Sequence, residues 1–225
     1  MPAHIAICGW NDNGVRLLRD LVRSTPRPSI SIVSHPAPCL DEYSGQILVF
    51  DLDPSTQAGL DAVGIDTADV AVILADPNRG RSQDIDARTI LTILAIERAR
   101  PEIYTIAELI NEDNVFHAQN AGVDEVLIAE AYIGGILSQA VCRPGVTEIF
   151  SDIFRSGVGS RIVERPAGDG AGQRFSVLSA ALRTADDGVL IGYRRAGKLT
   201  LSPREDTVLA ETDRLVLLQR LSERS

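Results

Sequence analysis

The sequence has few cysteines, no long apolar run and a deficit of basic residues. Its three cysteines, Cys8, Cys39 and Cys142, lie far apart and are odd in number. This excludes a disulfide framework and a cysteine-rich zinc site, and it favours a reduced, cytosolic environment. No apolar run approaches the roughly 18 residues that a membrane-spanning helix needs. We therefore expect neither a pore nor a membrane anchor within these residues.

The deficit of basic residues bears on the ligand. Lys and Arg total 22 against 31 Asp and Glu, which gives a formal net charge of −9 at pH 7. This balance argues against general nucleic-acid binding and favours cationic ligands. No signal peptide is expected, because Met1–His4 lead directly into an apolar stretch. With 225 residues, 44% of them hydrophobic, the chain can bury the core of one large domain or two small ones.

Short apolar stretches alternate with helical patterns over the part of the chain before Pro144. The predicted strands are His4–Cys8, Ile30–Val33, Ile47–Phe50, Val70–Leu74, Tyr104–Ala107 and Val126–Ile128. The predicted helices are Val15–Arg23, Gln57–Val63, Ile85–Arg100, Asn114–Ala121 and Ile133–Cys142. Val70–Leu74 has no polar interruption, as expected of a strand that is covered on both faces. The alternation predicts an α/β fold with a Rossmann-like, doubly wound parallel sheet.

The pattern changes after Gly145. The apolar residues of Val146–Phe154 stand at positions 146, 149, 150, 153 and 154, on one face of a helix that needs a partner to cover it. A glycine-containing loop, Pro166–Gly172, comes next. Further short strands are predicted at Val189–Tyr193, Lys198–Leu201 and Arg214–Gln219. We therefore predict a Rossmann-like domain at 1–145, a linking helix at 146–159 and a small α+β domain at 160–225.

A glycine-containing turn follows the first predicted strand. A dinucleotide fingerprint needs G-x-G-x-x-G at this place and an acidic residue at the end of the second strand. Gly9 and Gly14 occupy the first and third glycine positions, but Asn11 occupies the second, where the backbone approaches the pyrophosphate. The second strand ends in Ser34–Pro36, without an acid for a ribose. Two interpretations stay open: a site for NAD(H) or an adenine nucleotide, and a turn kept for packing alone.

Several segments resemble one protein family in their order and spacing. The segments are His4–Trp10, Asp51–Thr56, Asn120–Val126, Gly188–Tyr193, Leu201–Pro203, Asp206–Leu209 and Glu211–Leu215. Over nearly the whole chain they resemble the regulator-of-K⁺-conductance (RCK) family, with its TrkA-N and TrkA-C halves, and most of all its channel-linked members. Leu52 stands where the family has the glycine of a Gly-Asp-Pro/Ala-Thr segment. Asp51 joins Gly9, Asn11 and Gly14 as a candidate residue for binding a nucleotide.

The resemblance implies a regulatory module and not an enzyme. Members of the family form homodimers through the helices after the sixth strand, and 146–154 matches the helix that crosses to the partner. The dimers assemble into an octameric ring in the cytoplasm, at the inner face of the membrane, below a potassium pore or transporter subunit. A ligand in the cleft changes the hinge angle of the dimer, and the ring then moves the gate. Nucleic acid is not an expected partner.

Two carboxylates are candidates for a site that binds Ca²⁺ or another divalent cation. The calcium-gated channels of the resembled family carry carboxylates at the start of the helix after strand four and at the end of strand five. Asp86 and Glu108 match these positions, but Ile110 replaces a second glutamate of the pattern. Calcium takes six to eight oxygen ligands in irregular geometry. The alternatives are a helix-start acid favoured by the dipole for Asp86 and an acid paired with arginine for Glu108.

Two other functions stay open. A ligand-insensitive scaffold ring for a channel is favoured by Asn11 and Ile110. An NAD-dependent Rossmann enzyme would need a catalytic His, Lys or Tyr in the second domain, and Tyr193 and Lys198 lack the usual Tyr-x-x-x-Lys spacing. The basic stretch Arg79–Arg81 predicts either a contact for a phosphate or an acidic subunit, or a solvated loop.

Overall fold

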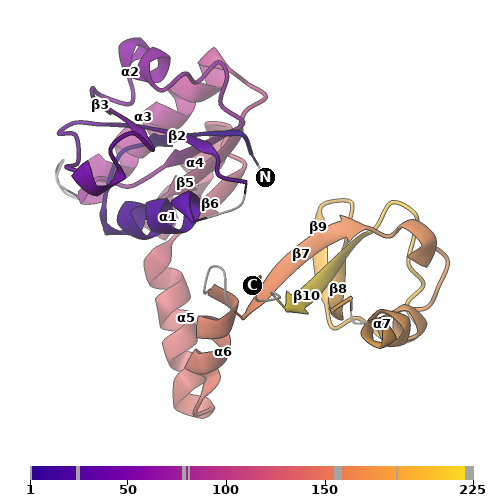
Figure 1. Cartoon of the computed structure of the whole chain (residues 1–225). Helices are drawn as coiled ribbons and strands as arrows, with labels where there is room; N and C mark the ends of the chain where they lie inside the picture. Colours follow the sequence, from indigo (N-terminus) through magenta and orange to yellow (C-terminus); the bar gives the residue numbers. More distant parts are fainter. Residues whose placement is uncertain are drawn as a thin grey trace. The chain divides into compact units, whose positions relative to one another are not determined.

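The chain folds into two compact units, Met1–Ser138 and Gln139–Ser225 (Figure 1). The computed structural model describes residues 2–23, 26–77, 80, 82–154, 159–185 and 187–220, without the side chains of Ser82 and Gln83. The division falls inside helix α5 (Ala129–Cys142). The limits predicted from the sequence for the first domain (1–145), the linking helix (146–159) and the second domain (160–225) stay predictions. Arg79 and Arg81 of the predicted basic loop lie outside the described residues.

The first unit is built on a six-stranded parallel sheet in the order β3-β2-β1-β4-β5-β6. Its strands are β1 (His4–Cys8), β2 (Ser29–Ser34), β3 (Leu48–Asp51), β4 (Val70–Ile73), β5 (Tyr104–Glu108) and β6 (Glu125–Leu127). Cys8 at the end of β1 pairs with Val33 of β2 on one side and with Ile73 of β4 on the other. The predicted Rossmann-like fold is confirmed, and its strand order reverses between β1 and β4.

Helices connect the strands of the first unit. They are α1 (Asp12–Val22), α2 (Gln57–Ala62), α3 (Ser82–Ala99), α4 (Val115–Asn120) and the start of α5, with 3-10 turns η1 (Asp41–Tyr43) and η3 (Glu112–Asn114). Helix α1 begins before the predicted Val15, because the Asn11 side chain caps it. Within the described residues, none of the helices combines the length and the apolar character needed to cross a membrane.

Apolar side chains cover both faces of the sheet in the first unit. Ile5 and Ile7 of β1 pack with Leu18 of α1 on one face. Ala6 and Cys8 point the other way and pack with buried residues of α2 and α3. Burial on both faces explains the uninterrupted apolar runs of these strands. It also raises the pKa of the Cys8 thiol to about 12, so that this thiol stays protonated and chemically inert at neutral pH.

The second unit contains a four-stranded antiparallel sheet in the order β7-β10-β8-β9. Its elements are α6 (Val146–Phe154), β7 (Ser160–Pro166), η4 (Gly168–Gly170), α7 (Phe175–Thr184), β8 (Val189–Arg195), β9 (Lys198–Leu201) and β10 (Arg214–Arg220). Helix α7 packs through Phe175, Leu178 and Leu182 against Leu190 and Leu215 of the sheet. A small C-terminal domain was predicted and is confirmed. Strand β7 was missed, because Ser-Arg-Ile-Val-Glu-Arg-Pro is mostly polar and its place comes from pairing with β10.

Helices α5 and α6 each carry exposed apolar side chains. Ile133, Leu137 and Val141 recur every four residues and so lie on one face of α5. Helix α6 exposes Ile149 and Phe154. All five side chains are more than half exposed. Large apolar side chains gathered on an exposed helix face mark an interaction site.

An ion pair anchors the turn that leads into β10. The Asp213 side chain is fully buried and accepts two hydrogen bonds from Arg195, from Nε and Nη2, both at 2.7 Å. Its second oxygen also accepts from the Ala210 backbone N–H at 2.8 Å. The Arg195 guanidinium in turn lies over the Tyr193 ring, 5.0 Å from its centre. Asp213 therefore joins the end of β8 to the start of β10.

We expect Arg195→Ala to lower the free energy of unfolding of the second unit by more than its control does, because it leaves the buried Asp213 carboxylate without its counter-charge. Arg214→Ala is the matched control. Arg214 is half exposed and reaches Glu164 at only 3.5 Å, so its loss should cost less than about 1 kcal/mol. Urea unfolding followed by circular dichroism measures both. Equal losses for the two variants would contradict the assigned role of Asp213.

The same ion pair predicts an acid sensitivity. The hydrogen bonds from Arg195 lower the pKa of Asp213 below its ordinary value. Because the folded-state pKa is lower than the unfolded-state value of about 3.9, the stabilisation is complete above that pH and is lost as the pH falls through the folded-state pKa. We expect the unfolding free energy of the second unit to fall below about pH 4, and to fall less steeply in Arg195→Ala. A series of unfolding curves against pH tests this, and parallel slopes would contradict it.

Candidate functional site

The candidate site lies at the carboxyl ends of β1, β4 and β5. Open parallel sheets bind ligands outside the carboxyl ends of their strands, at the point where the strand order reverses. In this sheet that point lies between β1 and β4. Gly9, Asn11 and Gly14 follow β1, and Glu108 ends β5. The turn residues and Glu108 therefore belong to the same edge of the sheet.

The two glycines of the turn make room for the strand next to them. Gly9 has a φ of +85°, and a Cβ atom there would lie 2.5 Å from the carbonyl oxygen of Leu74. A Cβ atom on Gly14 would lie 2.9 Å from the Leu74 side chain and 2.9 Å from the Trp10 ring. Position 9 therefore needs glycine for packing whether or not a ligand binds, and a side chain at position 14 would displace Leu74 and Trp10. This geometry favours the interpretation that the turn is kept for packing.

Both the oxygen and the nitrogen of the Asn11 side chain form hydrogen bonds within the protein. Its oxygen accepts hydrogen bonds from the backbone N–H groups of Asn13 (2.9 Å) and Gly14 (3.1 Å), so it caps α1. Its amide group donates to the carbonyl oxygen of Ala75 (2.6 Å) and to Glu108 Oε2 (2.6 Å). Asn11 thus links the turn after β1 to the ends of β4 and β5.

Glu108 is half-buried, and each of its oxygens has a donor. Oε2 accepts from the Asn11 amide and from the Ala75 backbone N–H at 3.2 Å. Oε1 accepts from the Asn13 amide at 2.6 Å. The partners that the described residues supply are amides, whereas an arginine was the alternative expected from the sequence. The carboxylate is therefore placed at the N-terminus of α1, where the helix dipole favours negative charge.

Asp86 is fully buried and holds the loop after β5. Its Oδ1 accepts from the backbone N–H of Ile110 at 2.9 Å. Its Oδ2 accepts from the backbone N–H of Asn111 at 3.0 Å and from the Asn114 amide at 2.7 Å. Asp86 and Glu108 therefore bind different partners. Among the described residues no group of three or more His, Cys, Asp or Glu side chains is arranged to hold a metal ion.

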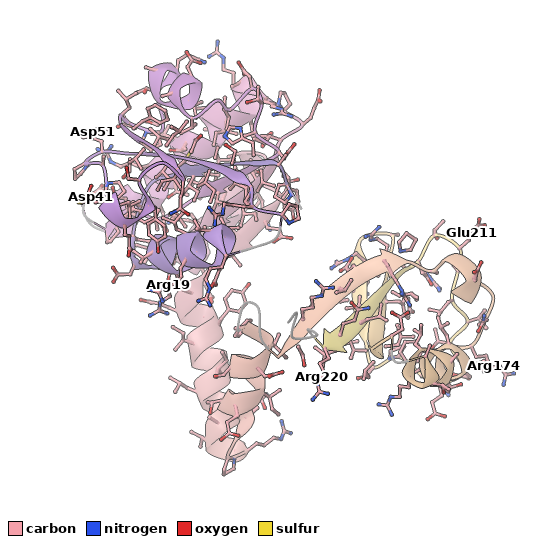
Figure 2. All side chains as sticks on the ribbon, in the orientation of Figure 1. Arg19, Asp41, Asp51, Arg174, Glu211 and Arg220 are labelled. Atoms are coloured by element: carbon pink, nitrogen blue, oxygen red, sulfur yellow. The ribbon has the colours of Figure 1, made fainter. Side chains whose placement is uncertain are left out.

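Asp51 ends the edge strand β3, and β2 separates that strand from β1 and its glycine turn. Figure 2 labels Asp51 on the first unit. Its Oδ1 is 2.9 Å from His35 Nδ1 and accepts from the Ala37 backbone N–H at 3.0 Å. The hydrogen bond with His35 lowers the pKa of Asp51, and both side chains are largely exposed. Since Ser34 of β2 pairs with Asp51, this carboxylate stands next to the place where the fingerprint expects an acid.

A small crevice lies beside the turn, between β1, β4 and α3. Its cavity of about 20 Å³ has room for roughly one water molecule. Cys8 and Leu74 line it from the sheet, and Thr92 lines it from α3. Arg88 and Asp53 also line it, with Arg88 Nη1 3.7 Å from Asp53 Oδ2. The crevice is thus lined by both strands on either side of the point where the strand order reverses.

Three participants in this network were missed from the sequence. Asn13, Asn114 and the backbone of Ala75 complete the hydrogen bonds of the two predicted carboxylates. Asn13 had a local signal, because Asn-Asp-Asn follows the first glycine at a position typical of helix caps. Asn114 and Ala75 had none, because their contacts join residues that are far apart in the chain.

Comparison with known proteins gives a family match. The model of the TrkA-N domain family matches residues 5–129, more than half of the chain. The matched range contains β1 from its second residue and the whole of the other five strands of the first unit.

Individual relatives are ion channels. The chain is 26% identical over 219 residues to the calcium-gated potassium channel TvoK of Thermoplasma volcanium, covering 96% of this chain and 62% of the channel. It is 26% identical over 139 residues to the putative potassium channel protein YugO of Bacillus subtilis, covering 60% of this chain and 41% of that protein. It is 26% identical over 235 residues to the probable ion channel POLLUX of Oryza sativa subsp. japonica, covering 96% and 24%. The chain thus spans less than two-thirds of each relative.

Solved structures show the same fold. The human SLO3 gating ring superposes with a TM-score of 0.77 at 15% identity, covering 98% of this chain and 44% of that one. The GsuK RCK domain superposes with a TM-score of 0.52 at 20% identity, also covering 98% and 44%. The likeness extends over both units of the chain.

We expect Asp86→Asn to lower the free energy of unfolding by about 1–3 kcal/mol, because an amide group cannot accept from all three donors and leaves one of them unpaired. Urea unfolding without added metal measures the loss. Glu112→Gln, an exposed change in η3, is the control and should stay within about 0.5 kcal/mol of the native chain. If Asp86→Asn unfolds like the control, Asp86 does not hold the loop.

Proposed function

The chain belongs to the TrkA-N domain family, and from this membership we propose that it is a cytosolic, ligand-sensing domain that regulates a potassium channel or transporter. The observation that carries the proposal is the similarity to TvoK, a calcium-gated potassium channel, over 96% of the chain. That coverage includes both units, and the fold likeness to the SLO3 gating ring does so too. The relatives named above are ion channels, and the proposal assigns no catalysis to the chain.

The proposed assembly rests on the exposed apolar faces of α5 and α6. Two copies that join through Ile133, Leu137 and Val141 of α5 would form a homodimer in which the same surface is used twice. The exposed residues of α6 would extend the contact. Such dimers would close into an octameric ring, and the ring would act on a membrane pore or transporter subunit.

The proposed ligand is a divalent cation such as Ca²⁺, with Asp86 and Glu108 as its carboxylates. Glu108 can change partners at low cost, because the Asn13 amide that it binds is exposed and can rotate to present its oxygen. Asp86 is held by two backbone N–H groups, which cannot rotate in this way. A cation would therefore meet Glu108 first, and binding at Asp86 would require the loop after β5 to move.

A second candidate function is a scaffold ring that binds no ligand. The observation that favours it is that every oxygen of Asp86 and Glu108 already accepts a hydrogen bond from the protein. A network that is complete without a ligand stabilises the fold on its own. Under this proposal the ring would only support the assembly of a channel.

The mass of the purified chain, measured by light scattering with and without millimolar Ca²⁺, separates the two candidates. We expect Ca²⁺ to convert dimers of the native chain into a larger ring. Glu108→Gln should remain dimeric, because it removes the charge that the cation meets first. Glu102→Gln is the matched control, because Glu102 precedes the first residue of β5 while Glu108 is its last. This variant should respond like the native chain.

Each outcome decides between the proposals. A dimer whose mass stays constant, with no heat on titration of Ca²⁺, supports the scaffold ring. A monomer under all conditions contradicts the assembly through α5 and α6. If Glu108→Gln still increases in mass with Ca²⁺ as the native chain does, Glu108 is not a ligand of the cation.

A further inference from the structure

The turn after β1 has two glycines of a dinucleotide fingerprint, yet the backbone N–H groups of Asn13 and Gly14 already donate to a side chain of the turn. In a nucleotide site the second position is glycine, so that the pyrophosphate can reach the backbone N–H groups at the start of the helix. Here that position is Asn11, and its side-chain oxygen accepts from Asn13 N and Gly14 N. A phosphate would have to displace this cap to reach the same donors.

Glu108 adds a fixed negative charge at the same place. Its oxygens lie 2.6 Å from the amide nitrogens of both Asn11 and Asn13, and Oε2 lies 3.2 Å from Ala75 N. The carboxylate thus gains the interaction with the helix N-terminus that a phosphate would otherwise gain. A phosphate brought here would also face the repulsion of a like charge.

The other end of a dinucleotide site is altered as well. The end of β2 offers Ser34 and His35 in place of an acid for the ribose hydroxyls. The nearest carboxylate described on the adjacent strand, Asp51, is engaged by His35 and by the Ala37 N–H. The residues present therefore do not fit NAD(H) or an adenine nucleotide.

We propose that Asn11 and Glu108 are specificity determinants that exclude phosphate-bearing ligands from this sheet edge, with Glu108 acting as a built-in anion in the place of the phosphate. The exclusion also favours cations at the same edge, because the charge that repels a phosphate attracts a metal ion. The inference concerns the turn alone, and it holds whether or not the chain assembles into a ring.

The test restores the fingerprint. Binding of ADP is measured by calorimetry and binding of NADH by its fluorescence, for the native chain, the double variant Asn11→Gly with Glu108→Gln, and the control Glu102→Gln. We expect no binding at millimolar ligand for the native chain and the control. The double variant should bind ADP at least about tenfold more tightly than the native chain, the effect of removing one unfavourable charge contact. Thermal unfolding checks that the variant is folded, because Asn11→Gly loses the hydrogen bonds to Ala75 and to residue 108 together with the helix cap.

Two results would overturn the proposal. One is binding of ADP or NADH to the native chain as tight as to the double variant. The other is a double variant that is folded and still binds neither ligand, since Asn11 and Glu108 would then not be what excludes them. The single variants Asn11→Gly and Glu108→Gln, each expected to tighten binding by a smaller factor, give the same decision if the double variant does not fold.

Discussion

The carboxylate of Glu108 joins the carboxyl ends of three neighbouring strands. Glu108 is the last residue of β5. Its carboxylate accepts a hydrogen bond from the Ala75 N–H just after β4 and another from the Asn11 amide in the turn after β1. These are the strands on either side of the point where the order reverses, where the connections on the two sides lead away from each other. Polar groups of the backbone at such a point need partners, and in many sheets of this type a ligand provides them. In this chain the side chains provide them.

This arrangement sets the electrostatic character of the site. The buried Asp86 and the half-buried Glu108 are both held by neutral amide donors, so their charges are solvated by the protein without being neutralised. Together with a net charge of −9, they make the edge of the sheet attractive to cations and unfavourable for anions. The electrostatic preference is therefore carried by the same contacts that stabilise the fold.

The sequence predicted the fold better than the site, for a physical reason. Periodicity is a local property, so the limits of β1 were predicted correctly from His4–Cys8 alone. Strand β7 was missed because it is defined by its pairing with β10 and not by its own apolar residues. Asp86 and Glu108 were selected as charged residues near strand ends, but their partners lie tens of residues away along the chain. Whether they bind a metal ion is a question that the pattern of residue types cannot answer.

Trp10 gives the turn an optical property. It is the single tryptophan of the chain, and its ring lies where a Cβ atom on Gly14 would meet it, beside the capped start of α1. The indole therefore lies next to the residues whose rearrangement any ligand at this edge would require. Its emission is an intrinsic reporter of the turn, free of background from other indoles and in no need of an attached dye.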